Sequence, residues 1–211
     1  PFSDPIAEGP VIQEADIRAL NGGMNMEGVF DIVKRVREKS DIALCLMTYL
    51  NPVFYYGYEA FCKKCAETGV DGLIIPDMPY EERGEILVEA KKNDVKVISF
   101  VAPTSAERIR QIAKDAEGFI YVVSSMGVTG VRSDITTDVA SIVNEIRQVS
   151  DTPTAVGFGI STPEQAANMA SSSDGAIVGS AIIKILAKEG ESSATAVYEY
   201  VEKMASAVHS V

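Results

Sequence analysis

The chain has 211 residues, of which 46% are hydrophobic and 23% charged, and this composition indicates one sizeable globular core. Lys and Arg number 19 against 30 Asp and Glu, and the net charge of −11 argues against a nucleic-acid partner. No apolar run approaches the ~18 residues that a membrane span needs, and 3 cysteines cannot form a disulfide framework, so we expect a cytoplasmic protein.

The chain opens on a loop, Pro1–Pro10, which is rich in proline and has no periodicity. Helical periodicity follows over Val11–Leu20 and Met26–Lys39. Short apolar runs then alternate with further helical patterns. The expected strands are Ile42–Tyr49, Gly72–Ile75, Val95–Val101, Phe119–Val123, Thr154–Val156 and Ala176–Val178. Four expected helices have both bounds: Tyr58–Thr68 with Gly69 as its C-cap, Glu81–Lys92, Ala181–Lys188 and Ala194–Val208. A capping box at Thr104–Glu107 predicts the start of another helix, and a further helix should end near Val149. A second capping box at Ser161–Glu164 predicts a helix that continues to Ser171.

This alternation is typical of an α/β fold with a parallel sheet. The nearly continuous apolar run Ile42–Tyr49 predicts a strand that is buried on both faces. Parallel strands of this kind either close into an eight-stranded barrel or stay open and doubly wound.

Glycine-containing turns follow the last two expected strands, in Ala155–Ser161 and Ala176–Ser180. Glycine lets backbone N–H groups approach an anion closely, and a following helix offers unpaired N–H donors. Barrels with eight βα units commonly hold phosphate after their last two strands, so the turns favour the barrel. Only six strands are recognised, and the two others would lie ahead of Pro1.

Polar side chains at or after strand ends are the candidates for chemistry, because barrel active sites lie there. They include no histidine and no lysine, so neither a metal site built on imidazole nor Schiff-base chemistry is expected. What remains is proton transfer between carboxylates and a phenol, acting on a phosphate-bearing substrate. Asp77 reads more readily as a turn or cap residue, whereas Tyr121 is as readily a satisfied core tyrosine as a catalytic one. The candidates are Asp4, Glu8, Thr48, Tyr49, Asn51, Asp77, Tyr121, Ser124 and Thr129.

Six motifs, in order along the whole chain, resemble the tryptophan synthase alpha subunit family. The resemblance implies a single (β/α)8-barrel domain over residues 1–211. It also implies that the protein is a lyase of tryptophan biosynthesis, which cleaves indole-3-glycerol phosphate to indole and glyceraldehyde 3-phosphate. It also implies an alpha2beta2 heterotetramer in which the beta subunit carries pyridoxal phosphate, while this subunit holds no cofactor and no metal. The motifs are Pro1–Pro5, Met47–Phe54, Gly72–Pro79, Gly127–Gly130, Val156–Ser161 and Val178–Ile182.

The resemblance assigns roles to individual positions. Glu8 would accept a hydrogen bond from the indole N–H, and Tyr121 would lie beside the glycerol chain. Thr129 would meet Glu8 when its loop closes. Gly130, Gly159, Gly179 and Ser180 would donate to the phosphate; Phe158, Ile12, Met47 and Ile74 would line the indole pocket; Asp4, Pro5, Asn51 and Phe54 would face the beta subunit.

The chain departs from the family pattern in two ways. Glu8 stands where the family has aspartate, so the carboxylate reaches one methylene further. The family's principal acid/base glutamate lies on the second strand, a few residues before the motif at Pro1–Pro5. We therefore expect the first βα unit and most or all of strand 2 to be absent from this chain, which would be part of a longer protein.

Two rival readings stay open. Another phosphate-binding barrel, such as indole-3-glycerol phosphate synthase or a phosphoribosyl isomerase, shares the glycine turns but not the motifs at Pro1–Pro5 and Gly127–Gly130. Alternatively, the chain is a catalytically silent phosphate-ligand-binding barrel that activates a beta-subunit partner.

Overall fold

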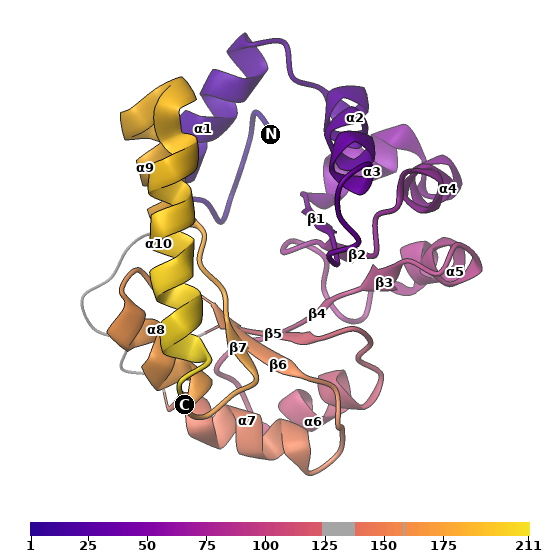
Figure 1. Ribbon diagram of the computed structural model, residues 1–211. Coiled ribbons are helices and arrows are strands. Elements are labelled where there is room, and N and C mark those ends of the chain that lie inside the picture. Colours follow the sequence, from indigo (N-terminus) through magenta and orange to yellow (C-terminus); the bar gives the residue numbers. More distant parts are fainter. Residues whose placement is uncertain (124–137, 158) are drawn as a thin grey trace. The chain divides into compact units, whose positions relative to one another are not determined.

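The computed structural model describes residues 1–123, 138–157 and 159–211, and within them helices alternate with parallel strands (Figure 1). The chain divides into two compact units, unit 1 (Pro1–Pro5 and Asp16–Ser99) and unit 2 (Ile6–Ala15 and Phe100–Val211). The strands are β1 (Cys45–Met47), β2 (Gly72–Ile74), β3 (Lys96–Val97), β4 (Ser99–Val101), β5 (Ile120–Val123), β6 (Thr154–Gly157) and β7 (Gly175–Ala176). The helices are α1 (Pro10–Asn21), α2 (Met26–Arg37), α3 (Leu50–Tyr56), α4 (Tyr58–Thr68), α5 (Gly84–Lys92), α6 (Ala106–Lys114), α7 (Val139–Arg147), α8 (Pro163–Ala170), α9 (Ser180–Glu189), the 3-10 turn η1 (Gly190–Ser192) and α10 (Ser193–Val208).

Unit 1 is a three-stranded parallel sheet in the order β1-β2-β3, with α2, α4 and α5 packed together beside it (Figure 1). Its core joins Phe30 of α2 and Phe61 of α4 to Leu73 of β2, and all three side chains are fully buried. Gly69 ends α4 in the left-handed conformation with φ of 89°, which confirms its prediction as the C-cap. Burial of these apolar faces is what holds the short strands and their helices together.

Unit 2 is a four-stranded sheet in the order β4-β5-β6-β7, whose described pairs β5-β6 and β6-β7 are parallel. The helices α6 and α7 contact each other, and α10 packs along α8 and α9. Ile120 and Val122 of β5 and Val156 of β6 are completely buried, and they alternate with Tyr121 and Ala155. Because alternate side chains of a strand point to opposite faces, Tyr121 and Ala155 share the second face of this sheet.

Two expectations for the strands are wrong in detail. The face of β1 that carries Met47 is exposed, since the helices of unit 1 pack on the other face, where Leu46 contacts the core. The expected strand Val95–Val101 is divided at Ile98 into β3 and β4, which belong to different sheets.

The expectations for helix starts also need correction. Both predicted capping boxes lie one residue too early: Ser105 caps α6, and the box of α8 pairs Thr162 with Gln165. The helix α3 was not expected, because Pro52 reads as a break. Pro52 lies in the first turn of α3, where its missing N–H costs no intrahelical hydrogen bond.

Candidate active site

Glu8 is held in unit 2 by the start of α1. Pro10 is the first helical residue, and the carbonyl of Gly9 accepts hydrogen bonds from the N–H groups of Ile12 and Gln13, each at 3.1 Å. The side-chain amide of Gln13 turns back and donates to the carbonyl oxygen of Glu8 at 2.8 Å. Although Glu8 is charged, only 8% of its surface is exposed. A buried acidic side chain on a residue whose main chain is held in this way is unusual for a loop and marks a candidate functional group.

Tyr121 projects from β5 in the same unit and is 6% exposed. Its ring stacks on that of Phe100 of β4, with 4.8 Å between ring centroids. Burial and then the nearby negative charge of Glu8 raise the pKa of Tyr121 to about 12. The phenol therefore stays protonated at neutral pH and can donate a hydrogen bond beside the carboxylate.

The raised pKa predicts a measurable alkaline titration. Unfolded tyrosine ionises near pH 10 and folded Tyr121 only near 12, so its contribution to stability is complete below pH 10 and is lost as the pH rises towards 12. We expect some of the 8 tyrosines to titrate late in ultraviolet difference spectra. Tyr56, whose hydroxyl donates to Glu27, also has a pKa raised to about 12. Tyr121→Phe and Tyr56→Phe should each remove one late-titrating group, and an unchanged late phase in Tyr121→Phe would contradict this assignment.

Gly157 of β6 makes room for Tyr121. A β-carbon added at Gly157 would lie 2.3 Å from the tyrosine hydroxyl oxygen and within 2.6 Å of two ring carbons. Such distances are far inside van der Waals contact, so the tyrosine side chain occupies the space that any side chain at Gly157 would need. The sequence pattern places Gly157 only in a predicted anion-binding turn, because the close approach of Tyr121 depends on packing between β5 and β6.

The two glycine turns differ in how their following helices are capped. At α8, the side-chain oxygen Oε1 of Gln165 accepts hydrogen bonds from the N–H groups of Ser161 and Thr162, so these donors are already used. At α9, the N-cap is Gly179, which has no side chain to cap the helix, and a β-carbon there would meet no atom within 4 Å. Ser180 begins α9, and no side-chain hydrogen bond caps the first turn of this helix, the part of a helix where an anion can bind.

Gly159 completes this edge of unit 2. Its φ of 87° lies in the left-handed region that glycine tolerates. β6 and β7 run parallel, and the N–H of Ile177 donates to the carbonyl of Val156 at 2.7 Å, so the segments after the two strands leave the same edge of the sheet. The structure thus brings Gly159, Gly179 and Ser180 to one edge of the sheet. The N–H groups of Ser161 and Thr162, however, already donate to Gln165.

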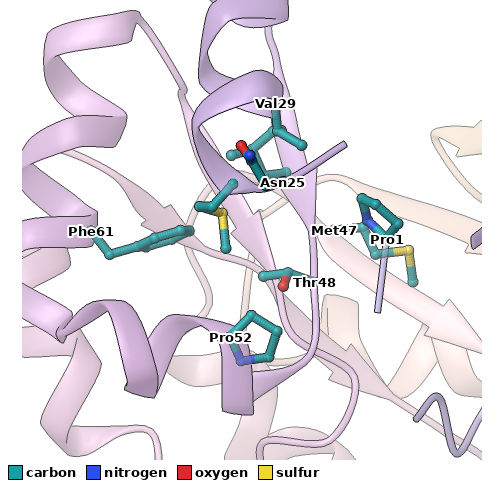
Figure 2. A pocket seen from close by; sticks show the side chains of 9 residues that line it. Pro1, Asn25, Val29, Met47, Thr48, Pro52 and Phe61 are labelled. Carbon is teal, nitrogen blue, oxygen red and sulfur yellow. The ribbon is translucent and has the colours of Figure 1, made fainter. Parts of the chain in front are cut away.

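Two predicted indole-lining residues lie opposite each other in unit 1. Met47 of β1 pairs in register with Ile74 of β2, and Met47 is 51% exposed. Met47 and Thr48 also border a cavity of about 60 Å³ between α2 and the start of the chain, shown in Figure 2. Ligand pockets usually measure roughly 300–1,000 Å³, so this cavity alone is too small to be the substrate site. Ile12, on α1, is half-buried in unit 2.

The predicted partner-facing residues all lie in unit 1. Asp4 and Asn51 are exposed, and Phe54 is 65% exposed, while Pro5 is half-buried. The Oδ1 of Asp77 accepts a hydrogen bond from the N–H of Leu50 at 2.9 Å, which confirms its prediction as a cap residue.

Four predicted candidates, Ser124, Thr129, Gly130 and Phe158, lie outside the described residues. Among those that are described, no group of three or more His, Cys, Asp or Glu side chains is placed to hold a metal ion. No helix in the described part of the chain is long and apolar enough to cross a membrane.

Parallel βα units, with a buried carboxylate near the phenol of β5 and glycine turns after β6 and β7, define an α/β protein of the kind that carries enzyme sites at its strand ends. A model of the tryptophan synthase alpha chain family matches residues 1–209. The chain belongs to this family. It is 50% identical to the tryptophan synthase alpha chain of Lacticaseibacillus casei over 99% of its own length and 78% of the relative's, and 49% identical to that of Thermoanaerobacter sp. (strain X514) over 89% and 72%.

Solved structures agree with this assignment. A protein of Aquifex aeolicus superposes with a TM-score of 0.88 at 38% identity, over 98% of this chain and 78% of that one. A Pyrococcus furiosus structure, described as the structural basis of mutual activation of the tryptophan synthase a2b2 complex, has a TM-score of 0.88 at 34% identity, over 98% and 84%. Family membership confirms the predicted barrel fold class and the predicted lyase of tryptophan biosynthesis, and the silent alternative is not favoured. The boundaries of a single domain over residues 1–211 stay a prediction.

Proposed function

We propose that Glu8 and Tyr121 carry the cleavage of indole-3-glycerol phosphate to indole and glyceraldehyde 3-phosphate by this chain. The observation that supports the assignment is that the negative charge of buried Glu8 helps to raise the pKa of Tyr121, and both residues belong to one compact unit. A carboxylate accepts hydrogen bonds and a protonated phenol donates them, so the pair offers both polarities to one substrate.

The bond that breaks joins C3 of the indole ring to the first glycerol carbon. Protonation at C3 places positive charge on the ring nitrogen, where the Glu8 carboxylate accepts the N–H hydrogen bond and stabilises that charge. Loss of the proton from the adjacent glycerol hydroxyl then forms the aldehyde carbonyl, and the electron pair of the C–C bond returns to the ring as indole. Tyr121 would hold the glycerol chain, and the two proton transfers would fall to the acid/base glutamate that the family resemblance implies.

The phosphate would be bound by uncharged groups. The uncapped N-terminus of α9 at Gly179 and Ser180, with the backbone of Gly159, supports this assignment. Gly130 would also donate to the phosphate, and Thr129 would meet Glu8 when its loop closes. The indole pocket would be lined by Phe158, Ile12, Met47 and Ile74.

The partner is a tryptophan synthase beta chain in an alpha2beta2 assembly, as the Pyrococcus furiosus complex supports. That partner would carry pyridoxal phosphate, and this chain would need no cofactor of its own. The surface would include Asp4, Pro5, Asn51 and Phe54. A cytoplasmic location is part of the same proposal.

The test is an assay of indole release from indole-3-glycerol phosphate by the full-length protein, with and without the beta chain. Indole release that the beta chain stimulates supports the proposal. Stimulation of the beta chain without any cleavage would instead identify the catalytically silent barrel, and ring closure or isomerisation of a phosphorylated substrate would identify another barrel enzyme.

A further inference from the structure

The junction between β1 and α3 joins three parts of unit 1. Tyr49 is the N-cap of α3 and Leu50 its first helical residue, and Tyr49 has no side-chain capping hydrogen bond in the helix. The cap comes from another segment instead: Asp77, in the turn after β2, accepts the hydrogen bond from the N–H of Leu50. A carboxylate at this position also faces the positive end of the helix dipole.

The same junction holds the start of the chain. The ring of Phe2 packs against that of Tyr49, with 5.3 Å between centroids, and Tyr49 is buried. The loop that carries Asp4 and Pro5 is therefore fixed to the residue that precedes α3. The neighbouring residues Tyr49 and Leu50 therefore anchor both predicted partner-facing segments, the loop at the start of the chain and α3.

The other anchors of α3 are contacts with the core of unit 1, where Tyr56 lies against the rings of Phe30 and Phe61. Val53 is buried, and Tyr56 at its last position donates to Glu27 at 2.6 Å, whereas Phe54 and Tyr55 are 65% and 92% exposed. With 7 residues, α3 has too few internal hydrogen bonds to hold its own orientation, so contacts from outside decide where its exposed aromatic side chains lie.

We propose that Asp77 is a positioning residue that fixes the N-terminus of α3, and with it the partner surface at Phe54 and Tyr55, relative to the strand end at Ile74. The inference rests on the proposed function, because it assigns a role in stimulation by the beta chain. Asp77 lies three residues after Ile74, which pairs with Met47 in the neighbouring strand. A change at these strand ends would reach the partner surface through one hydrogen bond.

The experiment compares Asp77→Ala, Asp77→Asn and Asp41→Ala in the full-length protein. Asp77→Ala should leave indole release without the partner within about twofold of wild type, but raise the Kd for the beta chain about tenfold, the effect of losing one charge-assisted hydrogen bond. Asp77→Asn keeps an acceptor oxygen and should restore most of the affinity. Asp41→Ala removes an exposed carboxylate from the same unit and should behave as wild type.

A double-mutant cycle with Leu50→Pro isolates the hydrogen bond. Proline is tolerated at the first helical position and lacks the N–H donor, and Tyr49, with φ of −77° and ψ of 161°, already has the extended backbone that precedes proline. In the Leu50→Pro background, Asp77→Ala should cause no further loss. Three results would overturn the inference: Asp77→Ala lowers the affinity for the beta chain equally with and without Leu50→Pro, Asp77→Ala keeps wild-type affinity, or Asp77→Ala lowers basal and stimulated indole release equally. A wild-type protein that neither cleaves the substrate nor binds the beta chain would refute the proposed function instead.

Discussion

Replacement of Glu8 by alanine should lower the rate of indole release by about 10²–10³-fold, the usual effect of removing one group that stabilises transition-state charge. The carboxylate is buried and lies near Tyr121, so under the proposed function its loss removes the acceptor for the indole N–H, while the N-terminus of α9 is formed by other residues. Binding of glyceraldehyde 3-phosphate, measured by calorimetry, should remain within a few-fold of wild type.

Two further variants separate charge from reach. Glu8→Gln keeps an acceptor oxygen without the charge and should lie between wild type and Glu8→Ala. Glu8→Asp restores the shorter carboxylate of the family and should retain high turnover. In Glu8→Ala the pKa of Tyr121 should fall, although burial keeps it above 10. Wild-type turnover in Glu8→Ala would remove this residue from the mechanism.

Gly157→Ala should reduce turnover by about 10²-fold, because a misplacement of about 1 Å at a positioning group costs this much. The new β-carbon would collide with the hydroxyl and ring of Tyr121 and must displace the side chain from its place over β6. We also expect unfolding free energy to fall by about 1–3 kcal/mol, the usual cost of overpacking. Indole release and denaturant unfolding measure the two effects.

Gly175→Ala is the matched control. Gly175 lies on the neighbouring strand opposite Ala155, and a β-carbon there would come no closer than 4.0 Å to the Ala155 side chain. This variant should therefore keep wild-type turnover and stability. Displacement of Tyr121 in Gly157→Ala should also advance its alkaline titration. If Gly157→Ala keeps both full turnover and the late titration, the close approach does not control the site.

The order and type of the elements could be predicted from the sequence to a large extent. The apolar runs at 72–75 and 119–123 became β2 and β5, and α4 has the predicted bounds, because a buried strand and an amphipathic helix each have a local signature. Cap positions were wrong by one residue, since Ser105 and Thr162 stand next to equally plausible cap residues. Strand length was overestimated at Ile42–Tyr49 for a different reason: strand ends depend on pairing with β2.

The sequence by itself determined the family of this protein and the residue types available to its chemistry: a carboxylate at Glu8, a phenol at Tyr121 and glycine turns after the last strands. Only the tertiary structure decided that Glu8 raises the pKa of Tyr121, that Gly157 leaves space for its ring, and that Asp77 caps a helix 27 positions away in sequence. The reason is that periodicity and turn chemistry act between near neighbours along the chain, whereas burial, charge interaction and cross-strand packing depend on which distant segments fold against each other.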